Sequence, residues 1–308
     1  MKPPKQAFWK KPGFRLFLMT TPLLALVFIF SYLPLSGWRY AFYDYRAGMK
    51  LSNCAYVGLK YFQSIFGNAY RIRDIVRVMR NTLAMSFLGL AASPLPMLFA
   101  IMLYEMRSNS YRRIVQTLTT LPNFISWVLV YSVAYSMFSI SDGFVNHVLI
   151  NWGVIDEGIN FLASRKHVWI TMLAYGVWKS LGWNSVLYLA ALTGVDQSLY
   201  EAARVDGAGR WDVILHIEIP SLLPTFFVLL LLSIGNIINS GLEQYYIFEN
   251  AMNKQYIEVL DLYVYNQGLA GNQIPYATAI GMLKSVISIT MLGVANGISK
   301  LVRGTSIF

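Results

Sequence analysis

Long apolar runs dominate this sequence and limit what it can fold into. A helix that crosses a bilayer needs about 20 mostly apolar residues. Six runs reach that length, and only the fourth and the sixth contain a charged residue, one lysine each. The runs are 16–38, 81–104, 114–140, 168–195, 219–242 and 274–299. We therefore expect an all-α membrane protein with six transmembrane helices.

The composition supports a membrane protein with several spans. Of the 308 residues, 56% are hydrophobic and only 13% are charged, and the mean hydropathy is +0.47. A soluble domain carries about 25% charged residues. The single cysteine, Cys54, excludes an internal disulfide. The net charge is +10, but the basic residues lie mainly in loops and tails, which predicts contact with lipid headgroups rather than with nucleic acid.

The basic tail 1–15 sets the expected orientation. It carries lysines and an arginine but no acid, so the positive-inside rule predicts that it is cytoplasmic. The first apolar run is too long for a signal peptide and has no small-residue cleavage site after it. Six spans return the C-terminus to the cytoplasm. Residues 16–308 then form one transmembrane domain, with external loops 39–80, 141–167 and 243–273.

Counted together with the basic tail, the predicted cytoplasmic segments contain hardly more lysines and arginines than the predicted external loops. Four arginines lie between 71 and 80, on the side predicted to be external. Apolar residues recur there at helical spacing, which predicts an interfacial helix that leads into the second span. We give more weight to the tail, because the first span usually sets the orientation.

A polar segment, 196–220, separates the fourth and fifth runs. Its first part favours a helix with Asp196 as N-cap. Gly207 and Gly209 then predict a break, since glycine adopts positive φ easily. A second short helix follows and leads to Pro220. Its apolar face consists of Trp211, Ile214 and Leu215. A helix–turn–helix with an exposed apolar edge is typical of a docking surface.

The order and spacing of residues in this segment resemble the EAA loop of permease subunits from binding-protein-dependent ABC importers. The matching elements are Glu201-Ala202-Ala203, Asp206-Gly207-Ala208, Ile217 and Pro220. Ile219 stands where the family usually has leucine. In that family the loop holds a coupling helix that sits in a cleft of the cytoplasmic ATPase. The resemblance implies an ATPase-coupling site at Glu201, Ala202, Ala203, Asp206, Gly207, Ala208, Trp211, Ile214, Ile217 and Pro220.

The resemblance extends over nearly the whole chain. The stretches AYVGLKYFQSIF, LPNFISW, WKSLGWNSVLYLAALTGVD and DLYVYNQGL are similar to the carbohydrate-uptake class and, within it, to the LplB-like polysaccharide-permease branch. This implies a type I ABC importer permease fold in the bacterial inner membrane. The implied partners are a second homologous permease in a heterodimer, two cytoplasmic ABC ATPases, an extracytoplasmic solute-binding protein and an oligosaccharide.

No enzyme chemistry is expected in this chain. The pairs Lys179-Ser180 and Lys284-Ser285 lack the glycine-rich loop of a phosphate-binding site, so ATP and magnesium should bind to the ATPase partner. The three histidines lack metal-ligand spacing, and no cofactor is expected. The alternatives are an importer for another solute, such as a peptide or polyol, and a membrane-embedded enzyme or passive channel. A channel would not need the loop, and an enzyme would need a catalytic constellation.

Polar side chains in the fourth and fifth runs indicate where a sugar could pass. Ser233, Asn236 and Ser240 are spaced i, i+3, i+7 and so are expected on one helical face. Their distance from the loop also resembles that of sugar contacts in maltose-importer relatives. Hydrogen bonding between helices is the alternative use of such residues. Lysines inside spans are costly, so Lys179 and Lys284 either face a wet cavity or have a partner in the protein. The predicted path comprises Lys179, Ser180, Trp183, Asn184, Ser233, Asn236, Asn239, Ser240, Glu243 and Lys284.

Overall fold

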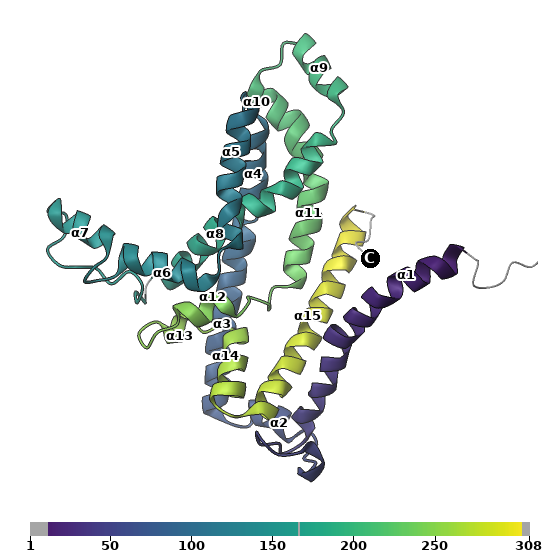
Figure 1. The fold of residues 1–308 in the computed structure, drawn as a ribbon, viewed down its shortest axis with the longest axis vertical. Coiled ribbons are helices and arrows are strands. Elements are labelled where there is room, and N and C mark those ends of the chain that lie inside the picture. Colours follow the sequence, from purple (N-terminus) through teal and green to yellow (C-terminus); the bar gives the residue numbers. More distant parts are fainter. Residues whose placement is uncertain (1–11, 166, 304–308) are drawn as a thin grey trace, which may run out of the picture. The chain divides into compact units, whose positions relative to one another are not determined.

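The computed structural model describes residues 12–165 and 167–303, which fold almost entirely into helices (Figure 1). In this part of the chain the only extended pairing is one bridge between Tyr43 and Tyr56. The chain forms two compact units. The first extends to Asn68 and includes Val264–Met282, and the second comprises Ala69–Tyr263 and the chain from Leu283 onwards. The all-α prediction is confirmed, while most of the predicted basic tail lies outside the described residues.

The first unit contains the first predicted span. α1 (Pro12–Val27), η2 (Phe28–Tyr32) and η3 (Leu33–Phe42) follow one another without a break and form an apolar segment over Leu16–Phe42. Two short helices follow, η4 (Leu51–Asn53) and α2 (Lys60–Phe66). The Tyr61 hydroxyl donates to Asp44 Oδ1 at 2.6 Å. This hydrogen bond lowers the pKa of Asp44 and ties the loop to α2.

The second predicted span is longer than its apolar run. α3 (Ala69–Ala92) and α4 (Pro94–Tyr104) together cover 36 residues. The interfacial helix predicted at 71–80 is the first part of α3 and continues into the span. α3 and α4 meet at Ser93, next to Pro94 and Pro96, because proline cannot donate to the helical ladder.

The third predicted span is not one helix. α5 (Asn109–Thr120) and the short η5 (Leu121–Phe124) are followed by α6 (Trp127–Phe138), which is bent by 105° from them. Ser126 lies in the break and caps α6, with its Oγ accepting from the Leu129 N–H at 3.4 Å. The run 114–140, predicted as one span, is therefore a bent pair of helices. α7 (Phe144–Asn151) follows.

α8 (Val168–Thr193) is the predicted fourth span and packs against α4 and α5. A Cβ atom on Gly182 would lie 2.3 Å from the Thr119 carbonyl oxygen, so only glycine allows α8 to approach α5 this closely.

Within the described residues, four segments are long and apolar enough to cross a membrane, or five if the bent pair counts as one span. α8 is long enough, but its polar residues make it less apolar than those segments. The six-span count stays a prediction.

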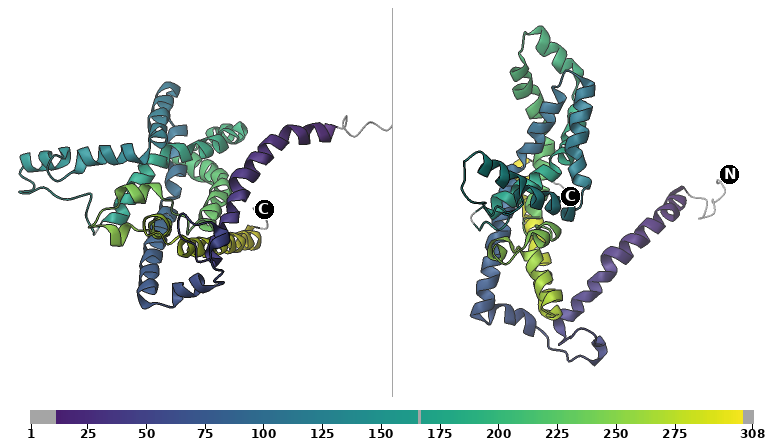
Figure 2. Two further views of the ribbon diagram at one scale, coloured as in Figure 1. Left: turned by 60° about the horizontal axis from the view of Figure 1, so that its bottom comes forward. Right: turned by 60° about the vertical axis from the view of Figure 1, so that its left-hand side comes forward.

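The polar segment forms α9 (Gln197–Val205), α10 (Arg210–Val213) and η6 (Ile214–Glu218). η6 runs directly into α11 (Ile219–Gly235), so the second helix of the predicted pair is the start of the next span and not a separate element. α9 and α10 lie at the same end of the second unit as the α4–α5 connection (Figures 1 and 2). α11 ends before the predicted Leu242. The Asn236 Nδ2 donates to the Leu232 carbonyl oxygen at 3.0 Å, and the residues after it form turns.

The remaining elements are α12 (Glu243–Phe248), α13 (Lys254–Ile257), α14 (Leu260–Tyr265), η7 (Asn266–Ala270) and α15 (Ile274–Arg303). In the second unit, buried Asn81 of α3 donates to the carbonyl oxygens of Gln255 and Glu258 at 3.0 and 3.1 Å. Phe248 of α12 packs in a buried apolar cluster with residues of α3, α6 and α8. The segment predicted as external loop 243–273 is thus largely helical.

Candidate functional site

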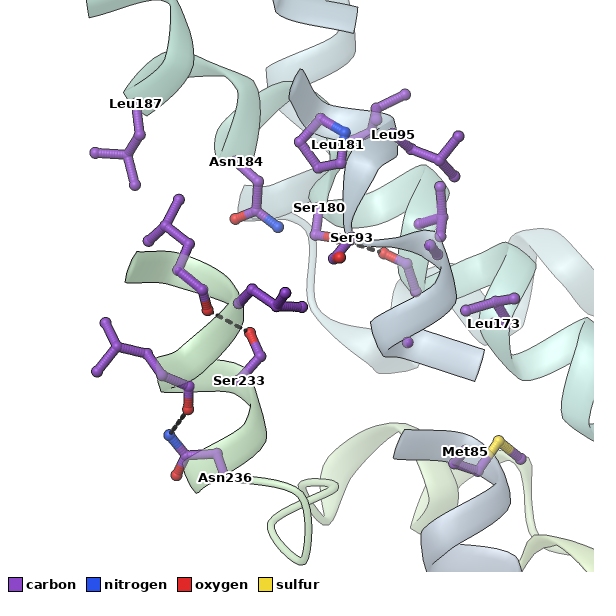
Figure 3. A pocket seen from close by; sticks show the side chains of 18 of the residues that line it. Met85, Ser93, Leu95, Leu173, Ser180, Leu181, Asn184, Leu187, Ser233 and Asn236 are labelled. Atoms are coloured by element: carbon purple, nitrogen blue, oxygen red, sulfur yellow. Dashed lines mark hydrogen bonds between the residues drawn. The ribbon is translucent and has the colours of Figure 1, made fainter. Parts of the chain in front are cut away.

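The second unit contains a cavity of about 530 Å³ between α3, α4, α8, α11 and α12 (Figure 3). A neighbouring hollow of about 340 Å³ lies between α3 and the turns that follow α11. The two hollows share Met85, Gly89, Ser233, Asn236 and Tyr245, so they lie side by side and are called the cavity below. Gly89 lies on α3, and a Cβ atom added to it would meet nothing within 4 Å.

Six of the ten predicted path residues line this cavity. Ser180, Asn184, Ser233 and Asn236 line the larger part, and the smaller part adds Asn239 and Ser240 to Ser233 and Asn236. Ser240 does not share a helical face with Ser233, because α11 ends at Gly235. The fold still brings the two serines together, through the turns that follow α11.

Sequence analysis did not assign Ser93, Gln244, Tyr188 and Tyr245, which also line the cavity. Ser93 lies at the break between α3 and α4, so the prolines on its C-terminal side are the signal that could have found it. Gln244 Nε2 donates to the Met172 carbonyl oxygen at 2.7 Å, which holds its amide against α8.

The polar side chains of the cavity are only partly satisfied by the protein. Ser180 Oγ donates to the Gly176 carbonyl oxygen at 2.8 Å and Ser233 Oγ to the Leu229 carbonyl oxygen at 2.9 Å. A hydroxyl that donates can still accept hydrogen bonds. The Oγ atoms of Ser93 and Ser240 are buried and have no hydrogen-bond partner among the described residues. The remaining acceptor capacity of Ser180 and Ser233 lets the cavity hydrogen-bond a polar solute or water.

The other four predicted path residues lie outside the cavity. Trp183 is half exposed and packs edge-on against Phe124, with 5.7 Å between ring centroids. Glu243 is exposed at the start of α12. Lys284 forms an ion pair with Asp261 of α14, whose other carboxylate oxygen accepts from the Gly241 N–H at 3.0 Å.

Lys179 is bound at the break of the third span. Its Nζ donates to the carbonyl oxygens of Pro122, Asn123 and Ile125 at 3.1, 2.8 and 2.6 Å. The ammonium also lies 5.5 Å from the ring centroid of Trp127, the first residue of α6. These carbonyl groups lie at the break between α5 and α6, and that of Pro122 also accepts from the Ile125 N–H at 3.2 Å. Lys179 therefore stabilises the bend and has a structural partner, one of the two alternatives that the sequence left open.

The break between α9 and α10 has the geometry of a Schellman motif. Asp196 caps α9, with its carboxylate accepting from the Ser198 N–H at 3.0 Å, which lowers the pKa of Asp196. At the other end, Gly207 has φ +75°. The N–H groups of Gly207 and Ala208 donate to the carbonyl oxygens of Arg204 and Ala203 at 3.2 and 2.9 Å. Both the cap and the glycine break were predicted.

The loop carries an exposed apolar edge. Val205 is 87% exposed and Trp211 75% exposed, and Leu199 and Leu215 are also exposed. Ile214, which was predicted to share this edge, instead packs against the buried cluster around Leu222. Among the other predicted coupling residues, the exposed ones are Glu201, Ala202, Asp206, Gly207 and Pro220, and the half-buried ones are Ala203, Ala208 and Ile217. The arrangement can present α9 and the start of α10 to a partner.

Polar contacts fix the base of this loop to α4. Arg210 Nε donates to Glu105 Oε2 at 2.8 Å, and its Nη2 donates to the Glu105 carbonyl oxygen at 2.7 Å. Tyr200 of α9 packs against Tyr104, with 6.3 Å between ring centroids, and burial raises the pKa of its hydroxyl. Among the described residues, no group of three or more His, Cys, Asp or Glu side chains could hold a metal ion.

Comparison with known proteins gives consistent matches. Residues 92–304 match the family described as "Binding-protein-dependent transport system inner membrane component". The chain is 37% identical to Protein LplB of Bacillus subtilis (strain 168), over 92% of this chain and 88% of LplB. It is 35% identical to the polygalacturonan/rhamnogalacturonan transport system permease protein YteP of the same organism, over 92% of this chain and 87% of YteP.

A solved structure shows the same fold. The crystal structure of a bacterial ABC transporter involved in the import of the acidic polysaccharide alginate contains a chain that is 32% identical to this one. The TM-score is 0.83, and the match covers 94% of this chain and 96% of that chain.

We predict that Lys179→Met lowers the thermal stability of the purified protein. The substitution keeps the length of the side chain but removes the donor of the Asn123 and Ile125 carbonyl oxygens, while that of Pro122 keeps the Ile125 N–H at 3.2 Å. Each unsatisfied carbonyl group costs about 1 kcal/mol or more, so we expect a loss of about 2 kcal/mol in total. The control is Lys254→Met, since Lys254 is more than half exposed and makes a surface ion pair with Glu249. Equal melting temperatures for the two variants would contradict the structural role of Lys179.

Proposed function

Because this chain belongs to the family of binding-protein-dependent transport system inner membrane components, we propose that it forms one half of an oligosaccharide path through the membrane. It is a transport subunit of an ATP-driven importer and not an enzyme. A second, homologous permease completes the path, and an extracytoplasmic solute-binding protein delivers the substrate. The observation that carries the proposal is the cavity, which presents serine, asparagine, glutamine and tyrosine side chains.

The proposed substrate follows from the chemistry of this cavity and from the names of the relatives. A sugar offers many hydroxyl groups that both donate and accept hydrogen bonds, and amide and hydroxyl side chains match both roles. The Ser180 and Ser233 hydroxyls donate to backbone carbonyl oxygens and can still accept hydrogen bonds from a sugar. YteP and the alginate transporter are both named for saccharide polymers.

In this proposal, two cytoplasmic ATPases bind ATP and magnesium and supply the energy for transport, while this chain holds no cofactor. The exposed edge of Val205 and Trp211 is the surface that we assign to ATPase docking. Since α10 and η6 continue into α11, a movement of the docked loop would reach Ser233 and Asn236 at the cavity through a single helix. A loop that connects a docking surface to the cavity wall in this way favours an ATP-driven transporter over a passive channel.

Narrowing the cavity should block transport. Gly89→Leu would place a large side chain where a Cβ meets only open space, so we expect uptake of the substrate to fall while the protein level stays normal. Replacing a glycine inside a helix gains about 1 kcal/mol of helix stability. The matched control is Ala91→Leu, at an exposed position on α3 that does not line the cavity. Wild-type uptake by Gly89→Leu would exclude this cavity as the path.

Disrupting the turn between α9 and α10 should uncouple ATP hydrolysis from uptake. Proline cannot adopt the φ of +75° found at Gly207, and Gly207→Pro also removes the N–H that donates to Arg204. We expect normal membrane insertion, with loss of uptake and of ATPase stimulation by the binding protein. Gly209→Ala is the control, because Gly209 has φ −76°. The docking assignment fails if Gly207→Pro retains both activities.

We also propose that both termini, the α4–α5 connection and the α9–α10 loop are cytoplasmic, with Met252 on the outside. Single cysteines at Ser110 and Met252, in a Cys54→Ser background, provide the test. Both positions are exposed in the chain. An impermeant thiol reagent added to intact cells should label Met252→Cys and not Ser110→Cys. Labelling of Ser110→Cys but not of Met252→Cys would show that the chain has the opposite orientation in the membrane.

A further inference from the structure

The cavity presents neutral groups to its contents. Among the described residues that line it, every polar side chain is a serine, asparagine, glutamine or tyrosine, and none is acidic, basic or histidine. These side chains can hydrogen-bond a carboxylate, but none carries a positive charge that would compensate the loss of hydration of that ion.

The lysine next to the cavity cannot supply that charge to a ligand. Lys179 directly precedes Ser180, which lines the cavity. An ammonium has three N–H groups, and the Lys179 ammonium contacts three backbone carbonyl oxygens at the α5–α6 break. Withdrawing it toward a ligand would leave these carbonyl groups without their donor.

Three further basic side chains on neighbouring elements of the second unit are also engaged by the protein. Lys284 of α15 pairs with Asp261. On α3, Arg77 Nη2 lies 2.7 Å from Glu258 Oε2. The guanidinium of Arg80 lies 5.9 and 5.8 Å from the ring centroids of Trp169 and Tyr256.

A charged residue next to the cavity-lining residues of α12 is acidic. Glu243 is exposed and directly precedes Gln244 and Tyr245, which both line the cavity. A carboxylate at this position repels anions, so the local field adds to the disadvantage of an acidic ligand.

We propose that this subunit selects uncharged oligosaccharides and disfavours uronic-acid oligomers. The inference rests on the proposed function and specifies its substrate class. A uronate carboxylate that entered the cavity would exchange its water for neutral dipoles, with no cation among the described residues of this subunit that line it, which is a costly transfer. A hydroxymethyl group on the same ring carbon carries no charge and matches the serine and asparagine groups present. The named substrate of the alginate transporter is acidic, so the proposal separates this chain from that relative.

The test is direct binding to the complete transporter in lipid nanodiscs, without its binding protein, so that the selectivity of that protein does not enter. Matched probes are a neutral galactose oligomer, the galacturonic-acid oligomer of the same length and linkage, and the methyl ester of that acid. The calorimetric Kd of the acid should be about tenfold or more weaker than those of the other two, because only the acid carries charge. The same comparison is made with glucose and glucuronic-acid oligomers.

Each outcome is decisive. Equal or tighter binding of the acid overturns the proposal. If no oligomer in either series binds, the cavity is not a saccharide site, and the proposed function falls together with this inference. If the acid is weak and its methyl ester is not, charge rather than size sets the preference.

A pair of variants tests whether the charge of the cavity is the cause. Asn236 lines both parts of the cavity, and Asn236→Lys would add a cation there. We expect it to improve binding of the acid relative to the neutral oligomer by about tenfold, since a nearby opposite charge compensates desolvation. Asn236→Met introduces a side chain of about the length of lysine but without charge, so it should not change the ratio of the Kd values for the acidic and the neutral oligomer. An unchanged ratio in Asn236→Lys would also overturn the proposal.

Discussion

Backbone carbonyl groups that leave a helix inside a bilayer must find donors, because lipid offers none. The arrangement of the second unit depends on how this requirement is met at the break between α5 and α6. A single ammonium, that of Lys179, donates to three carbonyl oxygens at the break, and of these the Pro122 oxygen also accepts from the Ile125 N–H. The bend of 105° sends α6 in a new direction. The same contact holds α8, which bears Lys179, against the break.

Close packing on the same face of α8 completes this arrangement. Gly182, three residues after Lys179, lies so near the Thr119 carbonyl that no Cβ would fit, and α8 packs along α4 as well as α5. With α8 held against α5 by both residues, Gly176, Ser180 and Asn184 lie along the cavity. The cavity wall is thus positioned by contacts that are not themselves part of it. The position of Lys179 within an apolar run is explained by structure without any contact to substrate.

Much of the fold was accessible from the sequence, because local signals determine it. Apolar runs located the spans, Asp196 located the start of α9, and Gly207 located its end. The α5–α6 break was not accessible, because it depends on a donor that lies far along the chain, at Lys179. The composition of the cavity was accessible in part. Ser233 and Asn236 were found by helical spacing, whereas Trp183 was assigned to the path and instead packs on Phe124.

The unbroken helix from Arg210 to Gly235 has a mechanical consequence. Its 26 residues span about 39 Å at a rise of about 1.5 Å per residue. It therefore acts as a lever arm, with Arg210 at one end and the cavity at the other. If the arm pivots near Arg210, where Glu105 holds it, a tilt of about 10° displaces the cavity end by about 7 Å. That distance exceeds the thickness of a sugar ring, so a modest rotation at the loop is enough to open or close the wall formed by Ser233 and Asn236.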